Sequence, residues 1–265
     1  VNLVQIAAGI AITENKERLT KQEVEWVIHN SQLSPRPEKR ISPQPQIGVV
    51  NGLAVYGPNM GVLIEIEATA RQVKEGSGQI TVTGIVEEEE LGGSRRTLRR
   101  KSMSKGSLEN VLTVLKQVEN LNTNLFDIHV NFPGGIPIDG PSAGVAIATA
   151  IYSAIKQIPI DNQVAMTGEI GIHGHVKAVG GVVAKVMAAK EAGATKVLIP
   201  KDNWQSIFDE IEGIKVIPVE EIKEVLSHTL IVDNHFKELG TPVPAGELLS
   251  AQGVLYQAES ERGFC

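Results

Sequence analysis

The sequence predicts an α+β protein in which an antiparallel β meander precedes a half of alternating strands and helices. The composition is 42% hydrophobic but only 4% aromatic, which favours a core of Val, Ile, Leu and Ala between strands and covering helices. Residues 47–86 consist of β-type runs separated by glycines. From residue 127 onward, short apolar strands alternate with helical patterns. These observations together indicate the mixed fold class.

A short helical region precedes the main domain. The spacing predicts one amphipathic helix over residues 11–29, in which Thr20 caps and Glu23 follows three residues later. Prolines and polar residues then fill the stretch from Ser34 to Gln46, and such a stretch breaks regular structure. The predicted organisation is a helical segment with a proline-rich linker at 1–45, a main domain at 46–230 and a C-terminal tail at 231–265.

Periodicity assigns the elements of the main domain in chain order. The runs at 47–57, 61–73 and 79–86 predict the three strands of the meander, because the second run alternates apolar and polar residues. A helical pattern at 108–121 follows. The remaining predictions are strands at 127–132, 164–172, 196–200 and 215–219, and helices at 142–157, 182–193, near 203–211 and near 219–227.

Charge and composition exclude some classes of function. The net charge of −6 gives no broad positive field, so binding to DNA is not expected even though residues 95–101 form a basic run. That run and the acidic residues 87–90 are interpreted as one solvated loop. The apolar stretch from Ala143 to Ile155 is too short to span a bilayer, so we expect no membrane association.

The termini and the cysteine content predict a cytoplasmic fragment. The single cysteine, Cys265, is the last residue, so no intramolecular disulfide can form and a reducing compartment is expected. The first twenty residues do not have the pattern of a secretory signal. Because the chain begins with Val1 and not with Met, we interpret it as a fragment or a processed product.

Ser142 is the first candidate for chemistry. The segment NFPGGIPIDGPSAG, residues 131–144, delivers this serine through a glycine- and proline-rich turn to the start of an apolar helix. Free N–H groups at a helix N-terminus stabilise an oxyanion formed beside such a hydroxyl. Taken alone, however, the pattern favours a serine that caps the helix over a catalytic serine. A catalytic serine also requires a base, because a hydroxyl is a weak nucleophile at neutral pH.

Two kinds of base are available. His129, His173 and His175 fall near predicted strands, so a serine–histidine arrangement stays open, although HGH at 173–175 is more typical of a glycine-centred turn than of a metal site. Lys185 has only Val182, Gly181, Ala188 and Ala189 at helical spacing, so it projects from an apolar helix face and is expected to be buried. Burial lowers the pKa of a lysine and makes it a usable base, although a buried lysine can also simply pair with a carboxylate.

Three segments in order carry a family resemblance. DGPSAG at 139–144, TGEI at 167–170 and the lysine that follows GGVVA, Lys185, resemble the proteolytic domain of Lon proteases over roughly residues 45–230. The ordered set is much more specific than any one segment. Two stretches, PIDGPSAG and Val-Asn-Gly-Leu-Ala-Val, resemble the bacterial B-type more than archaeal forms.

The resemblance implies a serine endopeptidase with a Ser-Lys dyad. It assigns Ser142 as nucleophile, Lys185 as general base and Thr167 as a hydrogen-bond partner of the lysine. Amides around Gly140 and Ser142 would form the oxyanion hole, and Asp139 would shape the turn. No metal is implied. The resemblance therefore implies acyl transfer in which neutral Lys185 accepts the Ser142 proton.

The family also implies partners beyond this chain. Lon proteases are ATP-dependent AAA+ hexamers that degrade unfolded or regulatory proteins, yet this sequence contains no G-x-x-x-x-G-K-[ST] loop. We therefore expect no cofactor in this chain, ATP and Mg in a missing upstream ATPase module, and residues 1 to about 33 as a helical remnant of that module. The main alternative is a Lon-like scaffold domain without activity. Retention of Ser142, Thr167 and Lys185 argues against that alternative.

Overall fold

The computed structural model describes residues 2–30, 40–55, 60–84, 103–133 and 141–232. The chain divides into two compact units, residues 1–40 and residues 41–265. The charge clusters at 87–90 and 95–101, residues 34–39 of the linker and residues 233–265 of the tail lie outside the described residues.

The first unit is a pair of packed helices, α1 (Asn2–Thr13) and α2 (Lys21–Asn30). The prediction of one helix over 11–29 is therefore wrong, because α1 ends near residue 13 and Asn15 adopts a left-handed φ of 54°. The two helices are in contact, and Ala7, Ala11 and Val27 are buried in this unit.

The predicted cap at the start of α2 is confirmed. The Thr20 amide donates to Glu23 Oε2 at 2.8 Å, and the Gln22 amide donates to Thr20 Oγ1 at 3.3 Å. Glu23 is only 2% exposed and also accepts a hydrogen bond from Lys16. The hydrogen bonds from Lys16 and Thr20 lower the pKa of the Glu23 carboxyl to about 2.

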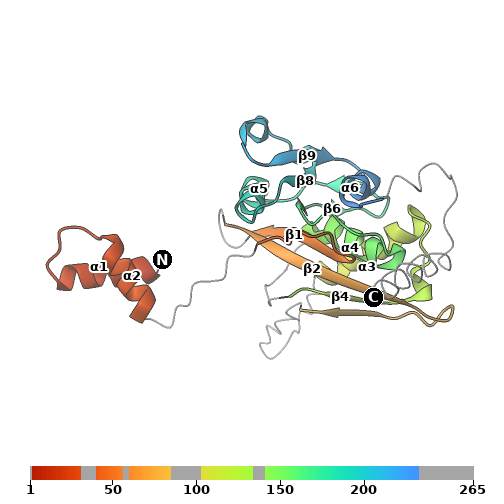
Figure 1. Cartoon of the computed structure of the whole chain (residues 1–265), viewed down its shortest axis with the longest axis horizontal. Helices are drawn as coiled ribbons and strands as arrows, with labels where there is room; N and C mark the ends of the chain where they lie inside the picture. Colours follow the sequence, from red (N-terminus) through yellow and green to blue (C-terminus); the bar gives the residue numbers. More distant parts are fainter. Residues whose placement is uncertain (1, 31–39, 56–59, 85–102, 134–140, 233–265) are drawn as a thin grey trace, which may run out of the picture. The chain divides into compact units, whose positions relative to one another are not determined.

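The second unit is built on a seven-stranded sheet in the order β3-β4-β2-β1-β5-β8-β9 (Figure 1). The β1–β2 and β2–β4 pairs are antiparallel and the other four pairs are parallel. A separate two-stranded sheet contains β6 and β7. The strands are β1 (Val49–Val55), β2 (Gly61–Gln72), β3 (Ile80–Thr83), β4 (Phe126–Asn131), β5 (Val164–Met166), β6 (Glu169–Ile170), β7 (Val176–Lys177), β8 (Lys196–Pro200) and β9 (Lys215–Val219).

Helices cover both faces of the central strands. The α-helices are α3 (Met103–Gln117), α4 (Gly144–Lys156), α5 (Val182–Glu191) and α6 (Ile222–Thr229), and short 3₁₀ turns are η1 (Thr123–Leu125), η2 (Pro141–Ala143), η3 (Lys201–Asn203) and η4 (Ser206–Glu210). Along β5, Val164 and Met166 pack in the cluster that contains α3, α4 and α6, whereas Ala165 packs in the cluster that contains α5. The sheet therefore separates α4 from α5. None of the described helices is long and apolar enough to cross a membrane.

The mixed α and β class is confirmed, but the three-stranded meander is wrong in its third strand. β3 pairs in parallel with β4, and β4 occupies the place beside β2 that the meander gives to β3. The physical reason is burial: Ile128 and Val130 of β4 are both 1% exposed, whereas the residues of β3 are mostly exposed. The apolar face of β4 therefore competes better for the place next to β2.

Two further element predictions need correction. The single strand expected at 164–172 is divided into β5 and β6, which belong to different sheets. The helix expected near 203–211 is two 3₁₀ turns, η3 and η4. The other strands and helices of the second half agree with their predicted positions within a few residues.

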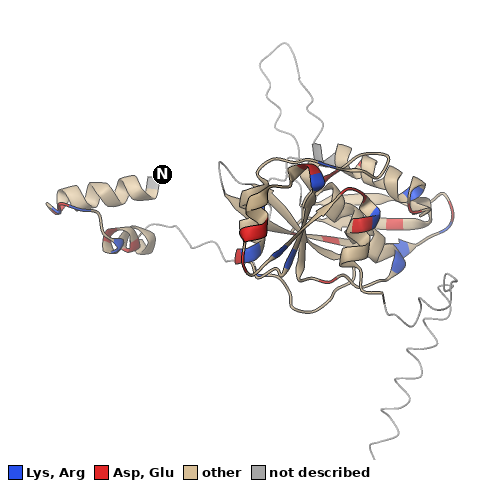
Figure 2. Ribbon diagram, turned by 90° about the horizontal axis from the view of Figure 1, so that it is seen from above, with Lys and Arg blue, Asp and Glu red and all other residues tan. Residues whose placement is uncertain are grey.

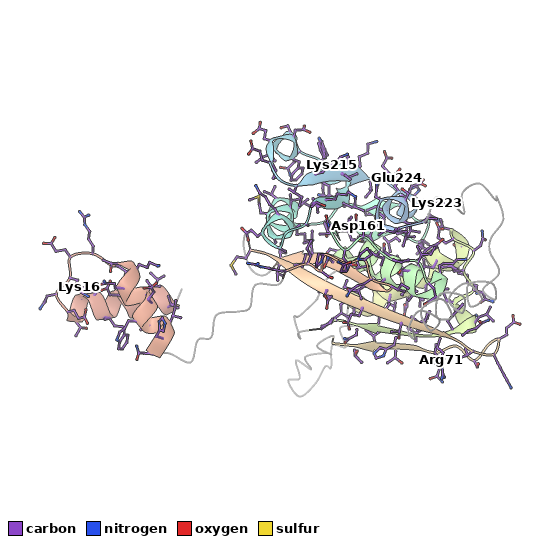
Figure 3. The ribbon with its side chains drawn as sticks, viewed as in Figure 1. Lys16, Arg71, Asp161, Lys215, Lys223 and Glu224 are labelled. Atoms are coloured by element: carbon purple, nitrogen blue, oxygen red, sulfur yellow. The ribbon has the colours of Figure 1, made fainter. Side chains whose placement is uncertain are left out.

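Charged residues are distributed over the described surface of the second unit. Figure 2 shows acidic and basic positions interspersed along its strands and helices. Arg71, labelled in Figure 3, pairs with Asp127 at 3.3 Å, and Asp161, labelled in the same view, pairs with Lys196 at 3.1 Å. Such exposed or half-exposed pairs contribute little to stability.

Candidate active site

The candidate site lies where β5 ends. Residues Thr167 and Gly168 separate β5 from β6 and belong to neither strand. The Thr167 amide still donates to the Leu198 carbonyl at 3.1 Å, which keeps this segment attached to β8. Because α4 and α5 cover opposite faces of the sheet, the end of a short central strand is a place that both helices can reach.

Ser142 lies in η2, directly before α4, and is half-buried. The N-cap of α4 is Ala143, which makes no side-chain capping hydrogen bond. Within the described residues the Ser142 hydroxyl makes no hydrogen bond at all. The interpretation of Ser142 as a capping serine is therefore wrong, and its hydroxyl remains available for chemistry.

Backbone hydrogen bonds fix the turn that carries Ser142. Its carbonyl oxygen accepts a hydrogen bond from the Gly168 amide at 2.9 Å, and the Val145 amide donates to the Gly168 carbonyl at 3.2 Å. This reciprocal pair joins the start of α4 to the segment between β5 and β6. The position of Ser142 is thus set by the same segment that contains Thr167.

Lys185 reaches the same segment from α5. It is 2% exposed, and its Nζ donates to Thr167 Oγ1 at 3.1 Å. The Thr167 hydroxyl in turn donates to the Ser142 carbonyl at 3.3 Å. The structure therefore brings Lys185, Thr167 and the backbone of Ser142 into one hydrogen-bonded chain.

The surroundings of Lys185 are apolar. Val182, Val186, Ala188 and Ala189 are buried beside it on α5. Desolvation lowers the pKa of the Lys185 ammonium from 10.5 to about 8. In about a tenth of the molecules Lys185 is then neutral at pH 7, a far larger fraction than for an exposed lysine. A neutral amine of this kind can accept a proton from a hydroxyl.

Two glycines determine where α5 lies. Gly181, the N-cap of α5, has a left-handed φ of 66°, and a methyl group there would lie 2.5 Å from Val55 Cγ1. A methyl group at Gly61 would lie 2.0 Å from the Ala184 carbonyl oxygen. The backbone of β2 therefore touches α5 one residue before Lys185.

The remaining predicted residues lie elsewhere. Asp139 and Gly140 lie outside the described residues, so their expected parts in the turn and the oxyanion hole stay predictions. His129 is exposed on the sheet face opposite to Ile128 and Val130, and it bonds with Thr83 Oγ1 at 2.9 Å. Because Ile128 and Val130 pack in the α4 cluster, His129 points away from the helix that follows Ser142.

His173 and His175 are exposed beside the β6–β7 hairpin turn, whose Gly174 has a φ of 89°. The prediction of a glycine-centred turn at 173–175 is confirmed. In the described part of the chain, no three His, Cys, Asp or Glu residues come together in a way that could hold a metal ion.

Ser107 is a neighbour of the site that sequence reasoning missed. It lies on α3, is 4% exposed, and its hydroxyl has no hydrogen-bond partner among the described residues. A methyl group at Gly144 would lie 3.3 Å from this hydroxyl and 2.9 Å from the Ile170 amide. No signal in the sequence identifies Ser107, because its only distinction is which residues of α4 and β6 pack against it.

Comparison with known proteins gives a consistent result. Residues 19–232 match the family described as Lon protease (S16) C-terminal proteolytic domain. The chain is 55% identical over 231 residues to Lon protease 2 of Bacillus subtilis, covering 87% of this chain and 42% of that protein. It is 34% identical over 257 residues to the archaeal Lon protease of Pyrococcus abyssi, covering 89% of this chain and 24% of that protein.

The archaeal Lon protease of Thermococcus kodakarensis is 36% identical over 250 residues, covering 86% of this chain and 36% of that protein. The chain thus spans less than half the length of these relatives. The higher identity to the Bacillus protein agrees with the expected bacterial type. The chain belongs to the Lon protease family and contains the serine endopeptidase domain of that family.

Proposed function

We propose that Ser142 and Lys185 form the catalytic dyad of this peptidase domain. The observation that carries the proposal is the hydrogen-bonded chain from buried Lys185 through Thr167 to the backbone of Ser142. The depressed pKa of Lys185 supplies a neutral base at physiological pH. The Ser142 hydroxyl lies in η2 directly before α4, accepts or donates no hydrogen bond within the described part of the chain, and supplies the nucleophile.

The proposed reaction is acyl transfer from a peptide to serine and then to water. Lys185 accepts the hydroxyl proton as Ser142 Oγ bonds to the substrate carbonyl carbon. The Lys185 ammonium then protonates the leaving amine as the carbon–nitrogen bond breaks. Water activated by neutral Lys185 hydrolyses the acyl-enzyme. Amides around Gly140 and Ser142 form the oxyanion hole, and Asp139 shapes the turn beside it.

The activity of the whole protein is a wider proposal. We infer that residues 46–230 are the peptidase module of a cytoplasmic, homohexameric ATP-dependent protease that degrades unfolded or regulatory proteins. Residues 1–45 would be the helical remnant of the ATPase module and its linker, and 231–265 a tail. These 265 residues contain no G-x-x-x-x-G-K-[ST] loop, so binding of ATP and Mg is assigned to sequence outside this chain.

The test is hydrolysis of casein without nucleotide from pH 6 to pH 10. Ser142→Ala and Lys185→Ala are expected to lose cleavage, whereas the matched control Lys190→Ala, which removes an exposed lysine from the same helix, retains it. Wild-type activity should rise with pH through about 8, because the base acts in its neutral form. Cleavage by either dyad variant at the wild-type rate, or no cleavage by folded wild type, would contradict the proposal.

A further inference from the structure

The segment that leads into α5 forms its backbone hydrogen bonds with a side chain and not with a neighbouring strand. Val179 lies between β7 and α5, outside both elements. Its amide donates to Asn203 Oδ1 at 2.8 Å, and Asn203 Nδ2 donates to the Val179 carbonyl at 3.0 Å. A primary amide carries one acceptor and two donors, so Asn203 satisfies both backbone groups as a neighbouring strand would.

Asn203 is itself firmly placed. It is the last residue of η3, which follows β8 directly. The next residue, Trp204, donates its amide to the Lys201 carbonyl at 2.9 Å and packs edge-on against Phe208. Phe208 is 3% exposed, within the same core cluster as α5. The two hydrogen bonds at Val179 therefore connect the start of α5 to a fixed point beside β8.

The attachment matters because α5 begins without a side-chain cap. Its N-cap is Gly181, two residues after Val179, and the Lys185 amide donates to the Gly181 carbonyl at 3.1 Å. A helix is stiff over one turn, so a shift of Val179 and Gly181 would be transmitted to Lys185. Lys185 in turn bonds to Thr167, which lies at the end of β5.

We propose that Asn203 is a positioning residue for the general base: its amide holds Val179, and through Gly181 it aligns α5 so that Lys185 meets Thr167 in a dry site. Asn203 does not touch Lys185 and is not itself catalytic. This inference rests on the proposed role of Lys185. Loss of the amide would let α5 shift and admit water to Lys185.

The test is Asn203→Ala in the full chain, assayed for peptide cleavage and for the titration of Lys185. We expect kcat to fall roughly tenfold to a hundredfold with KM little changed, because misplacement of a catalytic group by about 1 Å has effects of this size. The acidic limb of the pH profile should move upward from about 8 toward 10.5, because a hydrated lysine regains its ordinary pKa. The titration is read directly from the ¹³Cε resonance of Lys185.

The matched control is Asn162→Ala. The Asn162 side-chain amide also donates to a backbone carbonyl, that of Val49 at 3.2 Å, but Val49 belongs to β1 and not to the start of α5. This variant should lose thermal stability without moving the Lys185 titration. If Asn203→Ala does not fold, Asn203→Ser replaces it, because its hydroxyl still supplies a hydrogen-bonding group.

The outcomes separate this inference from the proposed function. A Lys185 titration that stays in place in folded Asn203→Ala overturns the positioning role, whatever happens to activity. A titration that moves while cleavage is unaffected supports positioning and contradicts Lys185 as the base. A titration and an acidic limb that move together support both.

Discussion

The buried amine of Lys185 is held by a hydroxyl whose only hydrogen is used elsewhere. Thr167 donates that hydrogen to the Ser142 carbonyl, so toward Lys185 its oxygen can only accept. Both the neutral amine and the ammonium carry hydrogens to donate. The Lys185–Thr167 bond therefore survives either protonation state, and the lysine keeps its position while a proton comes and goes.

At the residue scale, Lys185→Met should stabilise the folded chain at pH 7 while abolishing cleavage. Burial of the ammonium, with a pKa of about 8 in the folded state against 10.5 when exposed, corresponds to about 3 kcal/mol of lost stability. The lost hydrogen bond to Thr167 offsets about 1 kcal/mol of the gain. The measurement is the free energy of unfolding in urea.

The pH dependence of this effect has a definite sign. Below pH 8 both the folded and the unfolded chain are protonated at Lys185, so the full penalty is present. Between pH 8 and 10.5 the unfolded chain binds more protons, so the stability of the wild type rises with pH and the advantage of Lys185→Met shrinks. The exposed control Lys190→Met should show no such trend. A Lys185→Met chain less stable than wild type at pH 7 would refute the explanation.

The sequence predicted the surroundings of Lys185 because helical spacing alone places its neighbours. The expected burial is confirmed, and the expected hydrogen bond with Thr167 is present. Ser107 and Asn203 could not be predicted in the same way. Their importance depends on contacts with Gly144 and Val179, which are distant in sequence and meet only in the folded chain.

At the element scale, the placement of α5 depends on close approach of backbones. Periodicity predicted the extents of α4 and α5 well, since each helix is a local pattern. It could not predict that β4 inserts between β2 and β3, because alternation identifies a strand but not its partner. For the same reason it gave no sign that β2 meets α5 at Gly61.

Gly61→Ala is therefore expected to displace α5. The added methyl group would lie 2.0 Å from the Ala184 carbonyl oxygen, and backbone must move to accept it. We expect a loss of about 1–3 kcal/mol in the free energy of unfolding, together with reduced cleavage. The measurements are urea unfolding and casein hydrolysis.

The matched control is Gly106→Ala on α3, where an added methyl group meets no described residue within 4 Å. Alanine favours a helix over glycine by about 1 kcal/mol, so this control should be stabilised and active. Equal stability changes for the two variants would be inconsistent with the close contact at Gly61.

At the scale of the whole molecule, the sheet and its two helical layers form a complete core within the second unit. The first residues of this unit already bond to its core: the Ile41 amide donates to the Ala192 carbonyl at 3.2 Å, and Gln46 exchanges backbone hydrogen bonds with Ile160. The proline-rich composition of residues 34–46 indicated a boundary, and the compact units divide between Arg40 and Ile41. Composition could not show that the end of this segment pairs with the main core.

A chain of residues 41–265 should accordingly fold on its own. We expect its free energy of unfolding in urea to equal that of the second unit in the full chain within about 0.5 kcal/mol, since no contact within that unit is removed. A shorter chain of residues 48–265 loses the hydrogen bonds of Ile41 and Gln46 and should be less stable. Equal stability of the two shortened chains would contradict this assignment.

The all-round burial of α4 has a consequence for how substitutions are tolerated along the sequence. Residues 144–151 are all buried, in contrast to an amphipathic helix that exposes one side, and only Tyr152, Ile155 and Lys156 near the end of α4 are partly or fully exposed. Tolerance to substitution along such a segment does not repeat every 3.6 residues, because the side chains on every side of the helix pack against neighbours. In functional sequences, every position of the stretch that follows Ser142 should therefore accept only small or apolar residues. In α6, by contrast, the residues on one side of the helix should accept many substitutions and those on the other side few.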